Sequence, residues 1–195
     1  MAKEEYTIEA ITKKQCEPLL RDHHYLTAIS RGFKSGKNYG LVCCGKVVGV
    51  CIFTGLPTPE LAKGMFGLDR DDQHGLYELS RLVLHPENQE KEHNLAGWFV
   101  ARCIKDLRKA TNVRAILSYA DNDFHSGTVY RALGFKYFGL SERKKDFWIL
   151  QSDGSYKKHN RGSVRHLKGE WRDRTQKHRF LKVFDKTLNA KWRAQ

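Results

Sequence analysis

The residues best suited to chemistry lie in two short stretches of this chain. In the first, residues 118–121, an apolar run ends in the polar side chains of Ser118, Tyr119 and Asp121, and the second, residues 125–130, begins with histidine and ends with tyrosine. This spacing predicts the carboxyl end of a buried strand, then a turn and a short helix. Such a junction offers unpaired backbone N–H groups and a rigid base for side chains that meet a ligand.

Asp121 is the candidate general base at this junction. A carboxylate at the end of a buried strand is partly desolvated, which raises its basicity, and it can accept a hydrogen bond from an amino group. Aspartate is also a common cap residue, so Asp121 could instead cap the following turn or helix. The sequence leaves both interpretations open.

Arg81 interrupts an otherwise apolar run at residues 76–84. A buried guanidinium without a partner is costly, so Arg81 must meet an anion. That anion is either a carboxylate of the chain, from Asp121 or Glu78, or a phosphate or developing oxyanion of a substrate. We favour the functional interpretation because arginine is the usual choice for bidentate anion recognition.

Several neighbours are predicted to support these two residues. Ser118 is grouped with the catalytic residues, although no base partner for a nucleophilic serine is evident. Tyr119 is expected to stack on an acceptor, and His125 is a secondary group that can titrate near neutral pH. Glu78 and Ser80, the other polar residues of the 76–84 run, complete the predicted substrate-binding set.

The histidines do not predict a metal site. Cys16 with His23 and His24, or His85 with His93, can be assembled on paper, but neither spacing matches a known ligand pattern. We therefore interpret these histidines as surface residues and predict no metal.

Length and composition predict a single soluble domain with an appendage. With 195 residues and 40% hydrophobic residues, the chain can bury one good core. Its five cysteines form an odd number without C-x-x-C spacing, which favours reduced thiols and a cytoplasmic location. The charged amino terminus and the lack of a long apolar run predict neither a signal sequence nor a membrane partner.

Positive charge is concentrated toward the carboxyl end. Residues 151–195 carry 13 Lys and Arg against 4 Asp and Glu, whereas residues 1–150 carry 22 against 18. Cations interleaved with aromatic residues suit a nucleic acid, because bound phosphates release counterions and exposed rings stack on bases. The alternative is a solvated basic tail with a few aromatics docked on the core. The predicted nucleic-acid-binding residues are Lys157, Lys158, Arg161, Arg165, Arg172 and Arg174.

The pattern of elements predicts an α/β protein with a mixed sheet. We accordingly divide the chain into a domain at residues 1–150 and a basic C-terminal extension at residues 151–195. The expected elements are a helix from Thr12 to Tyr25 with a capping box at Gln15, a hairpin over 39–53, a strand over 76–84, a helix from Asn94 to about Lys109, a strand over 115–119, a short helix stopped by Gly134, and two final strands, 137–140 and 147–150, joined by a charged turn.

This order of elements resembles the GNAT superfamily of N-acetyltransferases. The match is carried by Y-x-x-x-G-F at residues 130–135, similar to that superfamily's late helix and its C-cap, and by L-x-L-H-P at residues 82–86, similar to its central strand. The resemblance implies a GNAT-like acyltransferase fold, a central mixed sheet flanked by helices. It also implies that Tyr130 is a general acid for a leaving group; the alternative is that Tyr130 packs with its hydroxyl at the surface.

The segment before the long helix departs from that superfamily, whose members hold the coenzyme A pyrophosphate there on a glycine-bearing loop. Residues 87–94 contain no glycine and four charged side chains, three of them acidic. Negative charge at this place would repel a pyrophosphate.

A closer resemblance covers most of residues 10–150. The motifs Y-E-L-S-R-L at 77–82, L-S-Y-A-D at 117–121 and H-x-G-T-V-Y at 125–130 are similar, in order and separation, to those of the Mom family of phage DNA-modification proteins. That family converts adenine in DNA to a carbamoylmethyl (acetamido) derivative at N6, which protects the DNA from restriction. The resemblance implies a phage-encoded enzyme of the host cytoplasm that acts on double-stranded DNA.

The resemblance leaves the acyl donor open between acetyl-CoA and glycyl-tRNA. Acetyl-CoA is the superfamily's usual donor, but an acetyl group lacks the nitrogen of a carbamoylmethyl product. A glycyl group contains every required atom, and the basic extension agrees with a tRNA partner. Two other functions stay open, namely a small-molecule or protein N-acetyltransferase and a non-catalytic nucleic-acid binder on this scaffold. The sequence gives no oligomeric state.

Overall fold

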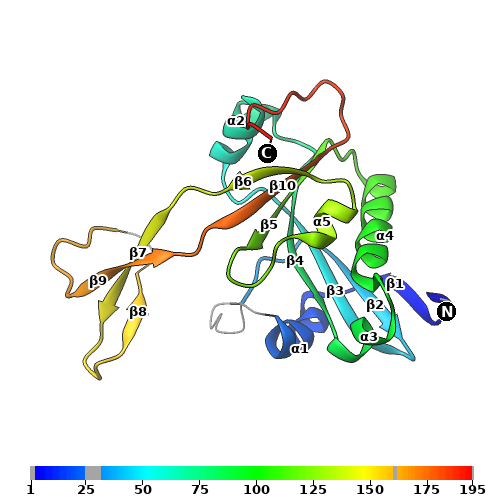
Figure 1. Ribbon diagram of the computed structural model, residues 1–195, viewed down its shortest axis with the longest axis horizontal. Coiled ribbons are helices and arrows are strands. Elements are labelled where there is room, and N and C mark those ends of the chain that lie inside the picture. Colours follow the sequence, from blue (N-terminus) through cyan, green and yellow to red (C-terminus); the bar gives the residue numbers. More distant parts are fainter. Residues whose placement is uncertain (1–2, 25–31, 160–161, 195) are drawn as a thin grey trace.

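The computed structural model describes residues 3–24, 32–159 and 162–194, and its centre is a mixed β-sheet (Figure 1). In the described chain seven strands form this sheet in the order β1-β2-β3-β4-β5-β10-β6, and only β4 and β5 run parallel to each other. The strands are β1 (Tyr6–Ala10), β2 (Lys37–Cys43), β3 (Lys46–Gly55), β4 (Leu76–Leu84), β5 (Ala115–Asp121), β6 (Lys136–Leu140) and β10 (Lys177–Val183).

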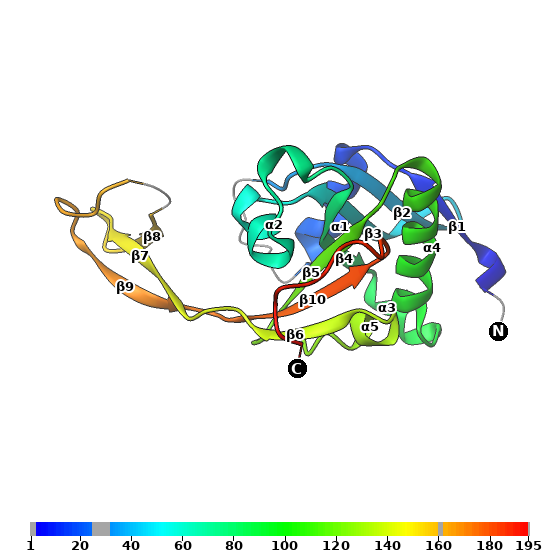
Figure 2. The ribbon, with the colours of Figure 1, turned by 90° about the horizontal axis from the view of Figure 1, so that it is seen from above.

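Helices cover both faces of this sheet (Figure 2). Successive strand residues point to opposite faces, so Val50 and Ile52 pack with α1 while Cys51 and Phe53 pack with α4. Along the described chain α1 and α2 share one face, and α4 and α5 lie on the other. The helices are α1 (Lys13–His23), α2 (Pro59–Phe66), α3 (Pro86–Lys91), α4 (Leu95–Ala110) and α5 (Thr128–Ala132), with 3-10 turns at Lys3–Glu5 and Arg70–Asp72.

Most of the predicted elements are confirmed. Thr12 and Gln15 form the expected capping box of α1, which ends at His23; Tyr25 lies outside the described residues. β2 and β3 form the predicted hairpin, and β4 has the predicted bounds. Gly134, with φ of +72°, follows α5 as expected. The strand predicted over 115–119 continues to residue 121.

Residues 137–140 and 147–150 are strands, as predicted, but they are not the final strands, and the turn between them is limited to residues 141–143. The first lies in β6, but the second lies in β7 (Lys144–Leu150), which pairs with β8 (Tyr156–Lys158) and β9 (Gly169–Arg174) in a separate sheet. β10 then enters the central sheet between β5 and β6. β10 has only two fully buried residues, Phe180 and Leu181. Because lysines and arginines surround them, the sequence shows no apolar pattern typical of a buried strand.

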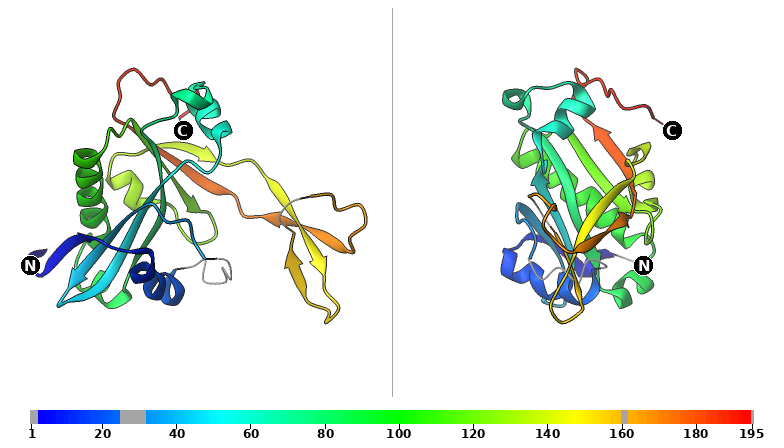
Figure 3. Two further views of the ribbon diagram at one scale, coloured as in Figure 1. Left: turned by 180° about the vertical axis from the view of Figure 1, so that it is seen from behind. Right: turned by 90° about the vertical axis from the view of Figure 1, so that its left-hand side faces the viewer.

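The separate sheet projects from the body as an arm, defined here as residues 144–174 (Figure 3). Residue 150, the predicted domain boundary, is the last residue of β7, and residues 177–183 belong to the central sheet. The basic stretch 151–195 is therefore divided between the arm, β10 and the segment after it. None of the helices in the described ranges is long and apolar enough to cross a membrane.

Candidate functional site

A cavity opens where β4 and β5 separate. The two parallel strands pair from Leu76 and Ala115 up to Leu79 and Ser118, and both continue beyond this point unpaired with each other. The buried Ser118 hydroxyl donates a 3.1 Å hydrogen bond to the carbonyl oxygen of Leu79 and closes the last pair. The Ser118 hydroxyl therefore links β5 to β4 at the point where the two strands separate, and this hydrogen bond occupies it.

A β-bulge in β4 shapes one wall of the cavity. Leu79 lies opposite Phe53 and Arg81 lies opposite Ile52, so Ser80 is an extra residue without an opposite partner. The Ser80 hydroxyl donates to the Ile52 carbonyl oxygen at 3.2 Å. Bulges change the direction of the side chains that follow, and here both Ser80 and Arg81 line the cavity.

The cavity has a volume of about 330 Å³. Its walls come from the far ends of β4 and β5, the segment 124–127, the first turn of α5, and single residues of α3 and α4. The structure brings five of the predicted site residues together around it, namely Ser80, Arg81, Tyr119, His125 and Tyr130. Ser118, Glu78 and Asp121 are not among the lining residues.

Asp121 holds the turn between β5 and the cavity segment. Its side chain is 7% exposed, and Oδ1 accepts the backbone N–H of Asp123 at 3.2 Å. The backbone carbonyl of Asp121 accepts N–H groups from Phe124 and His125 at 3.1 and 2.8 Å. These contacts correspond to the capping interpretation, and the role of Asp121 as a base stays a prediction.

Arg81 lines the cavity. Nη1 donates to the Ser80 carbonyl oxygen at 2.6 Å, and within the described ranges no carboxylate forms an ion pair with Arg81. Neither Asp121 nor Glu78 is thus its direct partner. A guanidinium so placed can bind an anionic group of a substrate.

Glu78 lies beside the cavity and has an altered proton affinity. Burial raises the pKa of its carboxyl group, although the positive charges of Arg81 and Lys177 oppose this. Burial, followed by the charge of Glu78, raises the pKa of Tyr119 to about 12. A carboxyl group with a raised pKa is a stronger base than a solvated one, which makes Glu78 a second candidate for accepting a proton.

His24 is a cavity residue that the sequence did not predict. The prediction of a surface histidine is wrong here, because His24 is 7% exposed and lines the cavity. Burial, with the charges of Arg81, His125 and Lys177, lowers its pKa to about 4. His24 is therefore a neutral imidazole at neutral pH. The sequence places His24 close to the predicted helix, but it does not predict that α1 packs on β4.

The start of α5 depends on close packing around Gly127. This residue has φ of +76°, and a Cβ atom there would lie 2.2 Å from the ring of Phe180. The Tyr130 ring packs 5.3 Å from Phe180 and 5.7 Å from Phe135, measured between centroids. Tyr130 thus both packs on the core and borders the cavity, and its role as an acid stays a prediction.

The residues before α4 do not fit the pyrophosphate of coenzyme A. The short helix α3 takes the place of a glycine-bearing loop, and it carries the exposed residues Glu87 and Glu90, followed by the half-buried Glu92. Asn94, the residue before α4, has φ of +55° and makes no side-chain cap. Acidic side chains here would repel an anion rather than bind it.

The predicted nucleic-acid-binding residues that the structure describes, Lys157, Lys158, Arg165, Arg172 and Arg174, lie in the arm. Asp146, whose side chain is 12% exposed, pairs with Lys158 and Arg174, and hydrogen bonding to Arg174 lowers the Asp146 pKa to about 2. The Arg172 guanidinium lies between two rings, 4.9 Å from that of Trp148 and 4.4 Å from that of Tyr156.

The other predicted residues of the arm that the structure describes are exposed to solvent. Lys157 and Arg165 are exposed, and Trp171 is 56% exposed. Arg161 lies outside the described residues. The arm therefore presents both cations and an accessible aromatic ring.

The base of the arm is next to the cavity. Lys177, which begins β10, lies opposite Asp121 in the sheet, and the Thr175 hydroxyl donates to Asp123 Oδ2 at 2.6 Å. A ligand on the arm would therefore lie close to the turn that leads into the cavity wall. The described residues include no group of three or more His, Cys, Asp or Glu side chains that could hold a metal ion.

Comparison with known proteins identifies both a family and a fold. The model of the Mom protein family matches residues 5–194. A search of curated proteins gives no match.

Solved structures that resemble this one are N-acetyltransferases and related proteins. The ribosomal-protein-S18-alanine N-acetyltransferase from Escherichia coli is 13% identical over 92% of this chain and 94% of that chain, with a TM-score of 0.54. An acetyltransferase from Bacillus subtilis in complex with CoA is 13% identical, with coverage of 92% and 98% and a TM-score of 0.52. The yncA protein from Salmonella typhimurium with its cofactor acetyl-CoA is 13% identical, with coverage of 93% and 95% and a TM-score of 0.53. The likeness confirms the predicted GNAT-like fold.

Proposed function

Because this chain belongs to the Mom protein family, we propose that it is a GNAT-fold transferase that converts adenine N6 in double-stranded DNA to the N6-carbamoylmethyl derivative and so protects the DNA from restriction. The observation that carries the proposal is the cavity at the separation of β4 and β5, with Arg81 lining it and a basic arm beginning beside it.

The cavity suits a single flipped base. Its volume of about 330 Å³ lies at the lower end of the range for small-molecule sites. Tyr119 offers a ring for stacking, and the neutral His24 can exchange hydrogen bonds without carrying a charge. Adenine N6 is paired and covered in a duplex, so the base must leave the stack at a cost of a few kcal/mol. Phosphate contacts along the arm would offset that cost.

Proton removal is needed because the N6 lone pair is delocalised into the ring. Asp121 and Glu78 are the two candidate bases. Asp121 is placed at the end of β5 but holds a turn, whereas Glu78 lies near Tyr119 and Arg81 and has a raised pKa. Arg81 would stabilise the oxyanion that forms as the acyl group is transferred, and Tyr130 would protonate the leaving group.

Glycyl-tRNA is the donor that we favour over acetyl-CoA. Attack of N6 on the glycyl ester forms an amide bond and releases the tRNA hydroxyl. The free glycyl amine then attacks ring carbon C6, giving a five-membered spiro ring. Breaking the original C6–N6 bond leaves the amine nitrogen on the ring and the former N6 as the terminal amide, which is the carbamoylmethyl product without redox chemistry.

Mass spectrometry of nucleosides tests the proposal. DNA from bacterial cells that express the protein should contain N6-carbamoylmethyl-2′-deoxyadenosine, and Arg81→Ala should abolish it. Comparison of Glu78→Gln with Asp121→Asn identifies the base, since only loss of the true base should abolish the product. Unmodified DNA despite soluble wild-type protein would refute the enzyme assignment and favour a nucleic-acid binder.

The donor needs a reconstituted reaction. Purified protein, duplex DNA and glycyl-tRNA labelled in the glycine should give labelled adenine. A product formed from acetyl-CoA with no label from glycine would refute the tRNA donor. Acetyl transfer to a protein or small amine, with DNA left unmodified, would support the N-acetyltransferase alternative that the similar structures suggest.

A further inference from the structure

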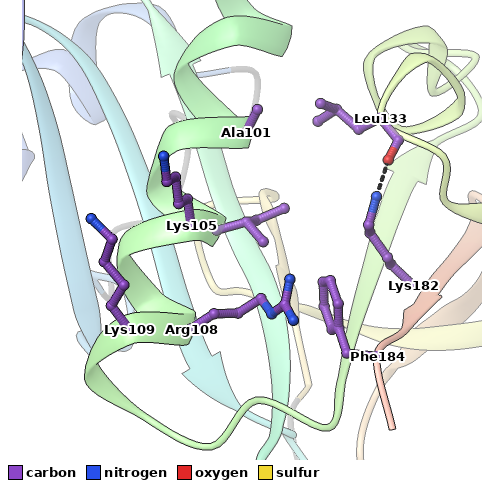
Figure 4. Close-up of a pocket in the computed structure, with 8 residues that line it drawn as sticks. Ala101, Lys105, Arg108, Lys109, Leu133, Lys182 and Phe184 are labelled. Carbon is purple, nitrogen blue, oxygen red and sulfur yellow. Dashed lines mark hydrogen bonds between the residues drawn. The ribbon is translucent and has the colours of Figure 1, made fainter. Parts of the chain in front are cut away.

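A second hollow, called the groove here, lies between the C-terminal half of α4 and the end of β10 (Figure 4). Its volume is about 430 Å³. The described residues that line it include no Asp or Glu. They are the cations Lys105, Arg108, Lys109 and Lys182 and the apolar residues Ala101, Ile104, Leu133 and Phe184.

Two of the groove's cations, Arg108 and Lys182, lie close to aromatic rings. Figure 4 shows Arg108 reaching from α4 toward Phe184, and its guanidinium lies 4.4 Å from the ring centroid. Lys182 donates a hydrogen bond to the Leu133 carbonyl oxygen, and its Nζ lies 5.9 Å from the same ring. Lys105 and Lys109 also line the groove, but Figure 4 shows their side chains projecting from α4 away from Phe184 and Lys182.

Lys109 pairs with Asp106 at 3.8 Å, whereas Arg108 and Lys182 have no carboxylate partner among the described residues, and their proximity is unfavourable without an anion. Burial, and then the charge of Arg108, lowers the pKa of Lys182, so the two cations repel each other. Like charges are held together in this way where a bound anion can offset the repulsion. The groove is also concave and partly apolar, with a volume in the range of small-molecule sites, and it cannot admit a duplex.

The groove is close to the cavity and remote from the arm. Ala96 borders the cavity and Ala101 borders the groove, which places them about 8 Å apart along the axis of α4. By contrast, Lys177 at the arm and Lys182 at the groove are separated by about 17 Å along β10. The groove and the cavity therefore flank the same helix, and a ligand in the groove would not need to contact the arm.

We propose that the groove binds the nucleotide phosphates of the acyl donor. This inference rests on the proposed transferase function. It also accounts for α3, since the donor's phosphates would be held by Arg108 and Lys182 and not by the acidic segment before α4. The shared ligand chemistry is a nucleotide with two or more phosphate groups, which occurs both in coenzyme A and at the 3′ end of a tRNA.

Binding measurements on the full chain test this inference without relying on activity. The probes are coenzyme A, adenosine 3′,5′-bisphosphate and a short single-stranded RNA that ends in CCA. We expect at least one probe to bind, and the double variant R108Q/K182Q to weaken it about tenfold or more, as loss of charge-assisted contacts predicts. Arg102→Gln is the matched control, because Arg102 lies on α4 outside the groove and stacks on Trp98.

The three probes also separate the two donors. Binding of coenzyme A or the bisphosphate alone would support a coenzyme donor, and binding of the RNA alone would support a tRNA donor. No binding of any probe, or an equal effect of R108Q/K182Q and R102Q, would overturn the inference. The single variant Arg108→Gln gives a second test if the double variant does not fold, and it should weaken binding severalfold. Unmodified adenine with intact groove binding would count only against the proposed function.

Discussion

The burial of His24 predicts that this protein loses stability in mild acid through one identifiable residue. The pKa of His24 is lowered from 6.5 to about 4, first by burial and then by the charges of Arg81, His125 and Lys177. The unfolded chain therefore takes up this proton before the folded chain does. The contribution of neutral His24 to the free energy of unfolding is complete above pH 6.5. It is lost as the pH falls from 6.5 toward 4.

The size of the effect follows from these two pKa values. Between pH 7.5 and pH 5.0, proton linkage at one such site removes about 2 kcal/mol from the free energy of unfolding. His24 is 7% exposed, and solvent at this position screens part of the effect of the neighbouring charges, so we expect about 1 to 2 kcal/mol. Glu78 works in the opposite direction, because an acid with a raised pKa stabilises the folded state as the pH falls.

Urea denaturation followed by tryptophan fluorescence at pH 7.5 and 5.0 measures the effect. The variant His24→Gln cannot be protonated, so it should lose about 1 to 2 kcal/mol less than the wild type between these pH values. The exposed neighbour His23 offers the matched control, since His23→Gln retains the His24 contribution. Equal losses in the wild type and in His24→Gln would refute a buried, neutral His24.

Three further predictions concern packing and charge. Ser118→Ala removes the hydrogen bond to the Leu79 carbonyl and should lower the free energy of unfolding in urea by about 1 to 3 kcal/mol, whereas an unchanged value would show that β4 and β5 do not need it. Gly127→Ala combines a left-handed backbone with a clash on Phe180, so it should cost about 2 to 4 kcal/mol and lower the melting temperature; a wild-type melting curve would contradict this packing. Lys157→Gln on the arm should reduce the slope of log K against log salt for duplex DNA by about 0.9, and an unchanged slope would exclude a phosphate contact there.

Elements specified by neighbouring residues were predictable from the sequence. The capping box of α1 needs only Thr12 and Gln15, and the β2–β3 hairpin needs only apolar strands around a short turn. β4 was predicted with its observed bounds because a proline follows close after its apolar run. In each case the residues that specify the element lie close together in the sequence.

Elements specified by distant contacts were not predictable. β10 joins the central sheet after a long excursion through the arm, and its two core residues, Phe180 and Leu181, stand among lysines and arginines. Its place between β5 and β6 is therefore determined by packing and not by a local pattern. His24 was missed for the same reason, since its burial depends on α1 packing against β4.

The candidate site was predicted in part because strand ends are marked in the sequence. Polar residues in the β4 and β5 runs identified Arg81, Ser80 and Tyr119, which the structure places around one cavity. The same reasoning did not predict that the side chains of Asp121 and Ser118 contact the backbone instead of lining the cavity. Both side chains are occupied by hydrogen bonds to the backbone, which a pattern of polar residues does not distinguish from contact with a ligand.

The protonation states around the cavity suit a neutral acceptor that develops negative charge during the reaction. Burial lowers the pKa of His24 and raises that of Glu78, and both shifts favour the uncharged forms. Arg81 keeps its charge, because a guanidinium does not lose its proton in proteins. An adenine could thus enter without desolvating many charged groups, and Arg81 would act most strongly on the acyl oxygen as it becomes negative. The phosphates of both substrates would then be bound away from the reaction, on the arm and in the groove.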